Sequence, residues 1–453
     1  MAVRSILELI GNTPMLEVTH LDTGPCRLFL KLESQNPGGS IKDRIAVSMI
    51  EAAERRGLLE KNALLVEATA GNTGLGLALV AGQKGYRLKI VVPDKMSQEK
   101  IFHLRAMGAE VVLTRSDVGK GHPEYYQDLA ERLAREEGGV FMNQFANDAN
   151  PAAHEKTTGP EIWAQLEHKV DAVVCGVGTG GTLTGLSRFF AKVSPATQMV
   201  LADPAGSILK EYVETKNVST EVGSWLVEGI GEDFIPPVSD LSRVKTAYSI
   251  PDKEAFMTCR ALLEREGILA GTSTGTLVSA ALRYCREQAE PRRVVSFVCD
   301  SGNKYLSKVY NDYWMIDQGL LEQEHFGDLR DLIARRHREH AVVSAGPDET
   351  VLAAYQRMKL YSISQLPVME GDRVVGLVTE EDILLEVLDN PGHFREPVRE
   401  AMEIRLVTVR PDESIDALVK IFDRGLVALV ADEKEFHGLI TRIDLLNWLR
   451  RKL

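Results

Sequence analysis

Short apolar runs alternate with longer mixed stretches between residues 62 and 113. The pattern predicts a strand for each short run and a helix for each intervening stretch of about 10 to 12 residues. Short apolar strands that alternate with helices are typical of a parallel α/β sheet. The predicted strands are 63–66, 88–92 and 110–113, and the predicted helices are 73–83 and 98–107.

The same alternation returns after residue 170, and a last apolar strand at 294–298 ends in Cys299-Asp300-Ser301-Gly302. We therefore expect residues 1–315 to form one two-lobed α/β unit with parallel sheets. The other predicted elements are strands at 15–18, 26–32, 170–175 and 198–202, and helices at 41–53 and 181–193.

The last part of the chain is an internal repeat. The segment 347–350 (PDET) recurs as 411–414 (PDES), and 376–382 (GLVTEED) recurs as 438–444 (GLITRID). Each copy predicts a helix, two short strands and a second helix. We expect two modules, 340–395 and 396–453, that pack together as a separate domain.

The charged segment 316–339 between these parts is predicted to be a linker helix with a solvated face. His337 and His340 lie three residues apart within this charged and presumed exposed stretch, so a shared metal is not expected.

Composition excludes several classes of protein. The net charge is −12, whereas a general nucleic-acid partner requires a basic surface. No apolar run reaches the length of a membrane span, and the N-terminus lacks a secretory signal. Five scattered cysteines without CxxC or zinc-ligand spacing indicate a reduced, cytoplasmic protein.

Candidate chemistry begins with Lys42, which follows the turn Asn36-Pro37-Gly38-Gly39-Ser40. The two glycines permit a tight turn, and Ser40 is a good N-cap for the next helix. The helix dipole at this end disfavours a cation and helps to lower the pKa of Lys42. A neutral amine suits Schiff-base chemistry. The alternative is a surface lysine beside Asp43 and Arg44.

Two further segments join a predicted strand to a predicted helix. In 67–74 (EATAGNTG), amides, hydroxyls and Asn72 converge at a helix N-terminus, which suits a carboxylate. In 176–185 (GVGTGGTLTG), glycines and threonines form a candidate phosphate cradle, although the spacing matches neither a dinucleotide fingerprint nor a P-loop. Plain helix capping and a packed glycine turn are the respective alternatives.

A lysine, a carboxylate loop and a phosphate loop together fit pyridoxal phosphate plus an amino acid. At this point the chain resembles the fold-type II pyridoxal-phosphate enzymes of the β-replacement branch, the family of cysteine synthase and cystathionine β-synthase. The resemblance runs from about residue 6 to residue 310. It includes 12–14 (NTP), 150–151 (NP) with His154, 203–204 (DP) and 228–231 (EGIG). The repeat resembles a pair of CBS modules (Bateman modules).

The resemblance implies roles for individual residues. Lys42 would hold the cofactor covalently, Asn72 would contact its ring oxygen, and Ser301 would be the hydroxyl beside its pyridine nitrogen. A hydroxyl there favours β-elimination over transamination, and Asp300 is the neighbouring alternative. The implied phosphate-binding residues are Gly178, Thr179, Gly180, Gly181 and Thr182, and the implied substrate-binding residues are Thr69, Ala70, Gly71, Asn72, Thr73, Gln144 and Gly229.

The implied reaction joins serine and homocysteine into cystathionine, with Lys42 acting as base and acid. The alternative is a cysteine synthase that uses O-acetylserine and sulfide. The module pair favours the first reaction. A third reading, a ligand sensor with an inactive catalytic lobe, is disfavoured because the segments around Lys42 and Asn72 are intact.

Some positions depart from the family pattern. Ala70 replaces a common serine, and Phe145 and Glu232 stand where the animal enzymes have tyrosine. Glu232 could contact the homocysteine ammonium group or face water. The fold is expected to begin almost at Met1, so no haem is expected, and the CxxC of those enzymes is absent.

The modules resemble binders of adenosine compounds. Thr379 with Asp382, and Thr441 with Asp444, suit phosphate and ribose contacts, but these residues could equally be helix caps. S-adenosylmethionine, AMP and no ligand all stay open. The module pair also implies a homodimer or homotetramer.

Overall fold

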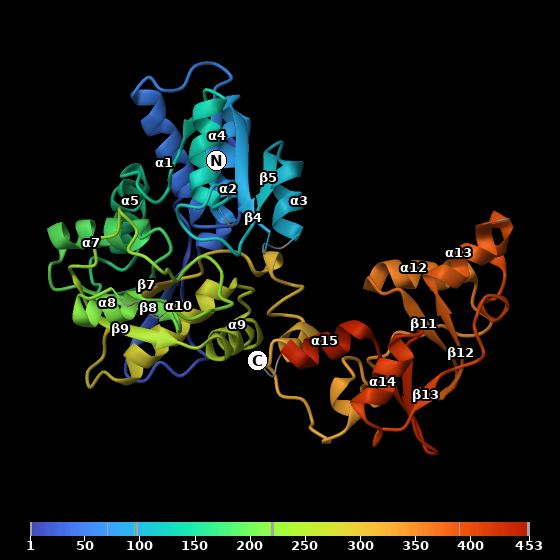
Figure 1. Cartoon of the computed structure of the whole chain (residues 1–453). Helices are drawn as coiled ribbons and strands as arrows, with labels where there is room; N and C mark the ends of the chain where they lie inside the picture. The colour runs from blue at the N-terminus through green and yellow to red at the C-terminus, as the bar shows by residue number, and fades with distance from the viewer. Residues whose placement is uncertain are drawn as a thin grey trace. The chain divides into compact units, whose positions relative to one another are not determined.

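The structure is a computed structural model that describes residues 2–69, 71–94, 96, 98–218, 222–388 and 390–450. It divides into two compact units, Met1–Tyr310 and Asn311–Leu453, both shown in Figure 1. Both units combine helices with small sheets, and the sheets of the first unit are largely parallel. This confirms the predicted α/β class.

The larger sheet of the first unit has six strands in the order β1-β2-β10-β7-β8-β9. Only the β1–β2 pair is antiparallel. Chain-distant strands therefore lie side by side, and β10 brings the segment after residue 297 beside the segment after Lys31. The strands are β1 (Met15–Glu17), β2 (Arg27–Lys31), β7 (Ala172–Gly176), β8 (Gln198–Pro204), β9 (Val244–Ile250) and β10 (Arg293–Phe297).

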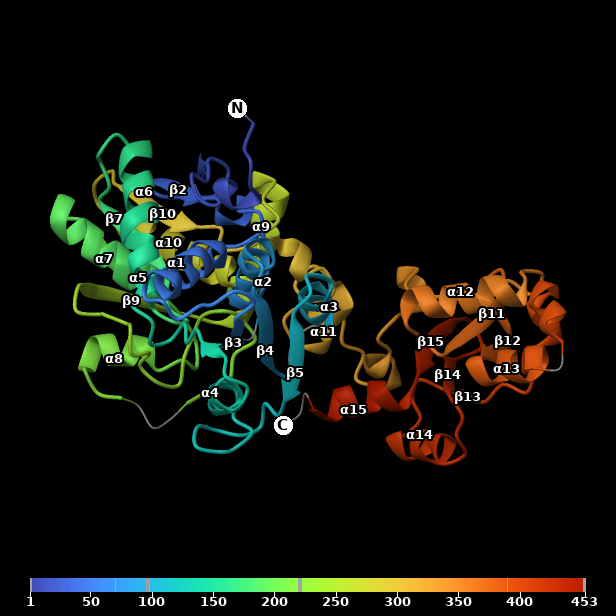
Figure 2. The same ribbon diagram turned by 90° about the horizontal axis from the view of Figure 1, so that it is seen from above.

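The smaller sheet has the order β5-β4-β3-β6 and is entirely parallel. Its strands are β3 (Leu64–Ala68), β4 (Arg87–Pro93), β5 (Glu110–Thr114) and β6 (Val140–Phe141). Leu65 packs with α1 (Lys42–Arg55) and α2 (Asn72–Lys84), whereas Leu64 and Val66 pack with α4 (Tyr126–Glu136). Alternate residues of β3 thus face opposite helical layers. Figure 2 shows α2 on one side of this sheet and α4 on the other.

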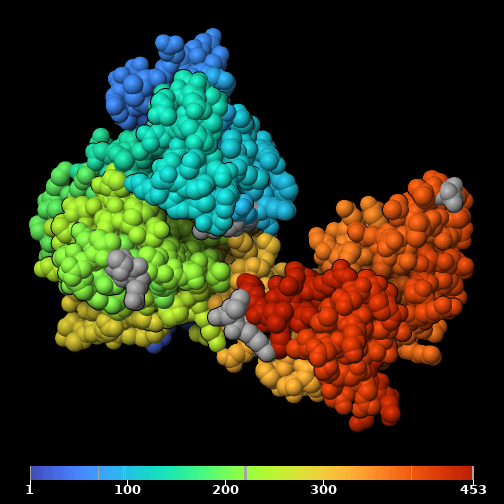
Figure 3. Space-filling model, viewed as in Figure 1, coloured from blue at the N-terminus to red at the C-terminus, as the bar shows by residue number. Residues whose placement is uncertain are grey.

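The remaining helices of the first unit fill the layers around these sheets. Helix α10 is buried along almost its whole length and packs against the larger sheet, so it has no polar face. Figure 3 shows the blue-to-cyan residues of this unit gathered beside its green-to-yellow residues. These helices are α3 (Gln98–Ala106), α5 (Ala149–Ala153), η3 (His154–Thr158, a π-helix), α6 (Gly159–Gln165), α7 (Gly181–Val193), α8 (Leu209–Thr215), α9 (Asp252–Glu266) and α10 (Thr272–Arg286).

The second unit contains the predicted repeat, and each copy has the predicted order of helix, strand, strand, helix. The first copy has its core around Val351, Leu366 and Val378, and the second around Leu418, Val430 and Ile440. The elements are α12 (Val351–Tyr361), β11 (Gln365–Glu370), β12 (Arg373–Thr379) and α13 (Glu380–Leu388), then β13 (Thr408–Val409), α14 (Ile415–Phe422), β14 (Ala428–Ala431), β15 (Phe436–Ile440) and α15 (Arg442–Arg450).

The predicted linker helix at 316–339 is wrong. Helix α11 (Asp312–Asp317) ends where that segment begins, and only two short 3-10 turns follow, η5 (Leu329–Leu332) and η6 (His337–Glu339). Leu329, Leu332 and Ile333 are buried in the core of the second module. Burial of these side chains fixes the segment against the module, which a solvated helix would not require.

Two features of the described residues bear on environment. No helix in this part of the chain has both the length and the apolar character needed to cross a bilayer. All five cysteines are free thiols, and four of them are buried.

Candidate active site

Lys42 is the first residue of α1, and its backbone N–H donates to Ser40 Oγ at 3.2 Å. The side chain lines a cavity of about 560 Å³ that opens to solvent. Burial lowers the pKa of Lys42 below its ordinary value, although the carboxylates of Glu232 and Asp300 oppose this shift. The interpretation as an exposed surface lysine is therefore wrong, and a fraction of neutral amine is available at lower pH than for a free lysine.

The turn before Lys42 is closed by Asp43. Its Oδ2 accepts a hydrogen bond from the N–H of Gly38 at 2.5 Å, and a Cβ at Gly38 would lie 2.5 Å from Oδ1. Gly39 adopts φ +73°, which favours glycine. Burial raises the pKa of Asp43 to about 6. Both glycines are thus required by the geometry that presents Lys42.

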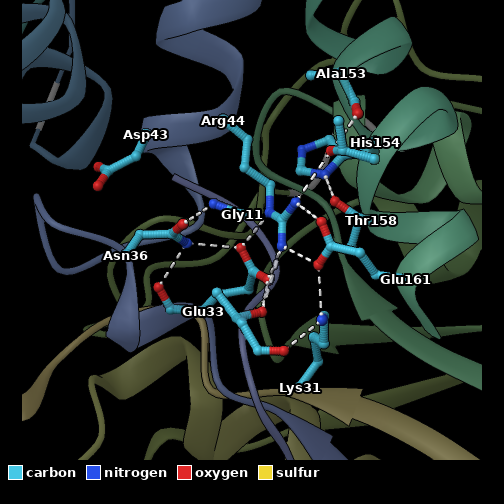
Figure 4. Close-up of polar contacts among 12 residues, drawn as sticks. Gly11, Lys31, Glu33, Asn36, Asp43, Arg44, Ala153, His154, Thr158 and Glu161 are labelled. Atoms are coloured by element: carbon cyan, nitrogen blue, oxygen red, sulfur yellow. Dashed lines mark hydrogen bonds and ion pairs between the residues drawn. The ribbon is translucent and has the colours of Figure 1, made fainter. Parts of the chain in front are cut away.

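Arg44 anchors the same helix start to the rest of the fold. Its Nε and Nη2 donate to the two oxygens of Glu33 at 2.7 and 2.8 Å, and its Nη1 donates to Glu161 at 2.7 Å. Lys31 completes the cluster with an ion pair of 2.8 Å to Glu161. Figure 4 shows this group converging from the first strands, α1 and α6.

The Arg44 cluster is charge-balanced and buried, with Arg44 and Glu33 side chains at most 2% exposed. Burial alone would raise the pKa of Glu161, but hydrogen bonds from Arg44 hold it at about 2. Asn36 joins the cluster by donating to Glu33 and accepting from Gly11, and so ties the turn to it. The lysine is therefore presented from a rigid base.

Asn72 lies at the start of α2 and also lines the cavity. Its Nδ2 donates to Asp300 Oδ2 at 2.8 Å, and its Oδ1 accepts from Lys304 Nζ at 2.8 Å. An amide nitrogen has two protons, so one remains for a ligand. The sequence analysis found Asn72 but gave no indication of Lys304.

The predicted carboxylate loop is assembled behind Asn72. Thr73 Oγ1 donates to Gln144 Oε1 at 2.6 Å, and Thr69 Oγ1 accepts from the N–H of Gly71 at 3.2 Å. Helix α2 has Gly71 at its N-cap and no side-chain cap, so its first N–H groups lack intrahelical partners. Ala70 lies outside the described residues. The structure thus brings Thr69, Gly71, Thr73 and Gln144 together.

The predicted phosphate loop lines the same cavity from Gly178 to Thr182. Gly180 is the N-cap of α7 at φ +85°, without a side-chain cap. A Cβ at Gly178 would lie 2.4 Å from the carbonyl oxygen of Gly229, and one at Gly181 would lie 1.8 Å from Asn150 Oδ1. The backbone N–H groups at this helix start therefore stay accessible.

His154 and Asn150 support the loop from behind. His154 Nε2 lies 3.2 Å from Thr182 Oγ1, and Asn150 Nδ2 donates to Thr179 Oγ1 at 2.8 Å. Burial lowers the pKa of His154 far below its ordinary value, so the ring is neutral. It occupies the π-helix η3, a local irregularity that often occurs at functional sites.

Ser301 is a predicted cofactor-binding residue that does not line this cavity. Its Oγ accepts from the N–H of Asn303 at 3.3 Å and caps a short 3-10 turn. Ser273 lines the cavity instead, near the uncapped start of α10. The sequence analysis missed Ser273, although 271–275 (GTSTG) is another small-residue segment before a helix.

The cavity wall includes further residues that the sequence analysis did not assign. Cys299 faces it with Lys42, and Glu228 lines it beside the predicted Gly229. Burial raises the pKa of Cys299 to about 12, so its thiol is neutral. Glu228 is held by ion pairs to Lys100 and to Lys308, the latter at 2.6 Å.

The donor set of this cavity fits pyridoxal phosphate. An uncapped helix start with clustered glycines suits a phosphate group, and a buried amine with a lowered pKa suits an aldehyde carbon. Asn72 offers an amide proton, and the uncapped start of α2 suits a carboxylate next to the cofactor. Lys42, Gly178–Thr182 and Asn72, the first residue of α2, all line one cavity.

The predicted module residues are hydrogen-bonded to each other at the starts of α13 and α15. Asp382 Oδ2 accepts from the N–H and Oγ1 of Thr379 at 2.8 and 2.7 Å. Asp444 Oδ2 accepts from the same groups of Thr441 at 2.7 and 2.6 Å. Capping accounts for these bonds, and a nucleotide contact stays a prediction.

Among the described residues, no group of three or more His, Cys, Asp or Glu side chains is arranged to hold a metal ion. The ring of His337 lies 5.5 Å from the ring of Phe436.

Residues 6–300 match the family model described as pyridoxal-phosphate dependent enzyme, and residues 331–389 and 398–451 match the CBS domain. The chain is 36% identical to cystathionine beta-synthase of Oryctolagus cuniculus, across 98% of this chain and 84% of that protein. It is 39% identical to cysteine synthase 1 of Emericella nidulans, but across only 70% of this chain.

A similar solved structure is the hydrogen sulfide-producing enzyme from Fusobacterium nucleatum. It has a TM-score of 0.62 and 39% sequence identity, and the match covers 67% of this chain and 100% of that one. The similarity to the cysteine synthase and to this structure is thus confined to about two thirds of the chain.

Proposed function

The chain belongs to the pyridoxal-phosphate dependent enzymes, in the family of cystathionine β-synthases, and from this premise we propose that it condenses serine with homocysteine to cystathionine and water. The observation that carries the proposal is the single cavity that joins Lys42, Asn72 and the loop Gly178–Thr182, in a chain that also carries two CBS domains. The full-length similarity to a cystathionine β-synthase supports the same reaction.

Pyridoxal phosphate, when bound, supplies the electron sink that makes the Cα proton of serine acidic. The residues that would hold it are Lys42, Asn72 and Gly178–Thr182. Lys42 Nζ has a lowered pKa because it is buried, so it can take the Cα proton of serine. It then protonates the hydroxyl group, which departs as water, takes the proton of the homocysteine thiol as the sulfur adds to Cβ, and delivers that proton to Cα.

The N-terminus of α2 would bind and orient the substrate. The substrate carboxylate accepts hydrogen bonds from the backbone N–H groups of Asn72 and Thr73 at the start of α2, and the helix dipole favours its negative charge. Gln144 holds Thr73 by the 2.6 Å hydrogen bond. The carboxylate is thereby fixed while the Cα–H bond faces Lys42.

Ser273 is the hydroxyl that we place beside the pyridine nitrogen, in the role that the sequence analysis gave to Ser301. Its position in the cavity wall near the start of α10 supports this assignment. A hydroxyl leaves that nitrogen without a formal charge, and this favours β-elimination over transamination.

The experiment that tests the reaction compares two assays on the purified, cofactor-loaded protein. One assay supplies serine and homocysteine and measures cystathionine, and the other supplies O-acetylserine and sulfide and measures cysteine. A higher kcat/KM in the first assay is expected. A higher value in the second would replace this proposal with a cysteine synthase that carries CBS domains.

The proposal also covers the ligand of the CBS domains, the oligomeric state and the cellular location of the enzyme. An adenosine compound at the CBS domains, with Thr379, Asp382, Thr441 and Asp444 as contacts, is supported by the family of those domains. A homodimer or homotetramer and a cytoplasmic location complete it, and the five free thiols support a reducing compartment. Size-exclusion chromatography with light scattering measures the oligomer directly.

A further inference from the structure

The second unit contains a cavity that the catalytic proposal does not use. It is a small cavity that opens to solvent, and the space inside and at its mouth together is about 280 Å³. It lies between the segment 326–338 and the start of β15, and neither Thr441 nor Asp444 lines it. Its polar lining is cationic on one side, with Arg330, Arg336 and Arg338, and has Glu435 and His437 on the other.

Phe326 organises the cationic side. The guanidinium carbon of Arg330 lies 4.1 Å from the ring centroid of Phe326, and those of Arg336 and Arg338 each lie 4.9 Å from it. The negative face of an aromatic ring attracts cations, so one side chain collects three arginines of a short segment. Three arginines around one ring form a local positive cluster, whereas the chain as a whole has a net charge of −12.

Two of the three arginines are neutralised by carboxylates. Arg330 pairs with Asp328 at 2.6 Å, and Arg338 pairs with Glu324. On the opposite wall, His437 lies between Asp432 and Glu435 at 3.0 and 3.3 Å. Arg330 and Arg338 are therefore each offset by one carboxylate, and the opposite side carries the two carboxylates of Asp432 and Glu435.

Arg336 differs from its neighbours. Its side chain is 4% exposed, and its closest carboxylate, Glu339, lies 3.6 Å away, beyond hydrogen-bond distance. Nη2 donates to the carbonyl oxygen of Glu324 at 2.8 Å, but Nε and Nη1 have no hydrogen-bond partner among the described residues. A buried guanidinium with two unused donors is costly, so its position at the cavity wall calls for an acceptor.

We propose that this cavity is a binding site for a phosphate-class oxyanion, with Arg336 as its principal ligand and Arg330 and Arg338 at its sides. Guanidinium groups suit phosphate because they are planar, permanently charged and rich in N–H donors. The phosphate comes either as the free ion or as part of a small molecule such as a nucleoside monophosphate. This site is independent of the proposed catalytic function.

The test is isothermal titration calorimetry on the full-length, cofactor-loaded protein, with inorganic phosphate and AMP as separate probes and chloride at equal ionic strength as reference. We expect Arg336→Gln to weaken binding of the phosphate-bearing probe at least tenfold. Arg338→Gln, at a half-exposed position with less risk to folding, should weaken it about threefold, because it removes one flanking charge. The matched control is Arg424→Gln, an exposed arginine of the same unit, which should not change binding.

The outcomes separate the sources of the phosphate. Binding of inorganic phosphate that depends on Arg336 and Arg338 identifies the free ion as a ligand. Binding of AMP alone, with the same dependence, identifies a phosphate carried by a nucleoside. Absence of binding of both probes to the wild type, or equal affinities of the wild type and both variants, would overturn the site. Neither result depends on which catalytic reaction the first unit performs.

Discussion

Lys304 Nζ lies 2.8 Å from Asn72 Oδ1 and donates a hydrogen bond to it. An ammonium group only donates, so the amide oxygen of Asn72 must face Lys304 and its nitrogen must face Asp300. Lys304 Nζ also donates to the carbonyl oxygens of Gly38 and Gly39 at 3.2 and 3.3 Å. One side chain thus positions both the asparagine of the cofactor site and the turn that carries its lysine.

Replacing Lys304 with methionine should therefore loosen the cofactor site. Loss of a hydrogen bond from a charged donor costs about 1.5–3 kcal/mol, and we expect a rise of roughly tenfold or more in the dissociation constant of pyridoxal phosphate. The visible absorbance of the bound cofactor should shift as well. Lys210→Met removes a lysine from a surface ion pair and is the control. Unchanged affinity and spectrum in Lys304→Met would refute the positioning role.

Lys42→Ala should abolish both turnover and the visible absorbance of covalently held cofactor, because no other amine among the residues lining the cavity can replace it. The measurement is an absorbance spectrum and a serine–homocysteine assay on the same preparation, with circular dichroism to verify folding. Substantial residual turnover would exclude Lys42 as the base.

Ser273 and Ser301 offer a direct comparison. Ser273→Ala removes a hydroxyl from the cavity wall and should lower kcat roughly 10- to 100-fold, whereas Ser301→Ala removes a cap of a short 3-10 turn and should cost at most about 1 kcal/mol of stability. Parallel steady-state assays and thermal unfolding measure both effects. A large loss of kcat in Ser301→Ala alone would restore the original assignment from sequence.

Arg44→Met should destabilise the fold strongly. The change leaves Glu33 buried without its bidentate partner, and such a loss typically costs about 3–5 kcal/mol. Arg115→Met breaks an exposed pair with Asp117 and should leave the stability nearly unchanged. Urea unfolding of both variants measures the difference, and equal midpoints would show that the buried cluster adds no stability.

The raised pKa of Glu67 should make the free energy of unfolding depend on pH. Glu67 is buried, and burial raises its pKa to about 8 from the ordinary 4.5. Between these values the folded protein holds a proton that the unfolded chain has released, so the free energy of unfolding falls as the pH rises from about 5 to 8. One group contributes at most about 1.4 kcal/mol per pH unit. Glu67→Gln should reduce this slope.

The measurement for Glu67 is urea unfolding at several pH values from 5 to 9. Glu131→Gln, at an exposed position of α4, is the matched control and should keep the wild-type slope. A Glu67→Gln protein with that same slope would mean that Glu67 is ionised in the folded state.

The fold of the first unit was largely predictable because its strands are short apolar runs bounded by turns, as in β3 and β4. Helix α10 was not predicted, because a helix buried on all sides lacks the polar face that a periodic pattern reveals. The segment 316–339 was wrongly predicted to be a solvated helix because many of its residues are charged. Its apolar residues Leu329, Leu332 and Ile333 are nevertheless buried.

The same contrast applies to the site. Lys42, Asn72 and the phosphate loop were found because glycines mark the turns that present them. Ser273 and Lys304 were missed because their roles depend on pairing between chain-distant strands, which one sequence does not display. Ser301 was chosen because it follows the last strand directly, but its hydroxyl is used by the local 3-10 turn.

The close packing of the glycines in and after the phosphate loop limits which mutations the gene can tolerate. Any side chain at Gly178 would strike the carbonyl oxygen of Gly229, one at Gly181 would strike Asn150, and one at Gly185 would strike the carbonyl oxygen of Pro151. Almost every missense change in these three codons is therefore disabling, while nearby surface codons drift freely. In a library of random variants, those that stay active should keep glycine at these three positions. The phosphate loop could therefore be located from the sequences of the active variants alone.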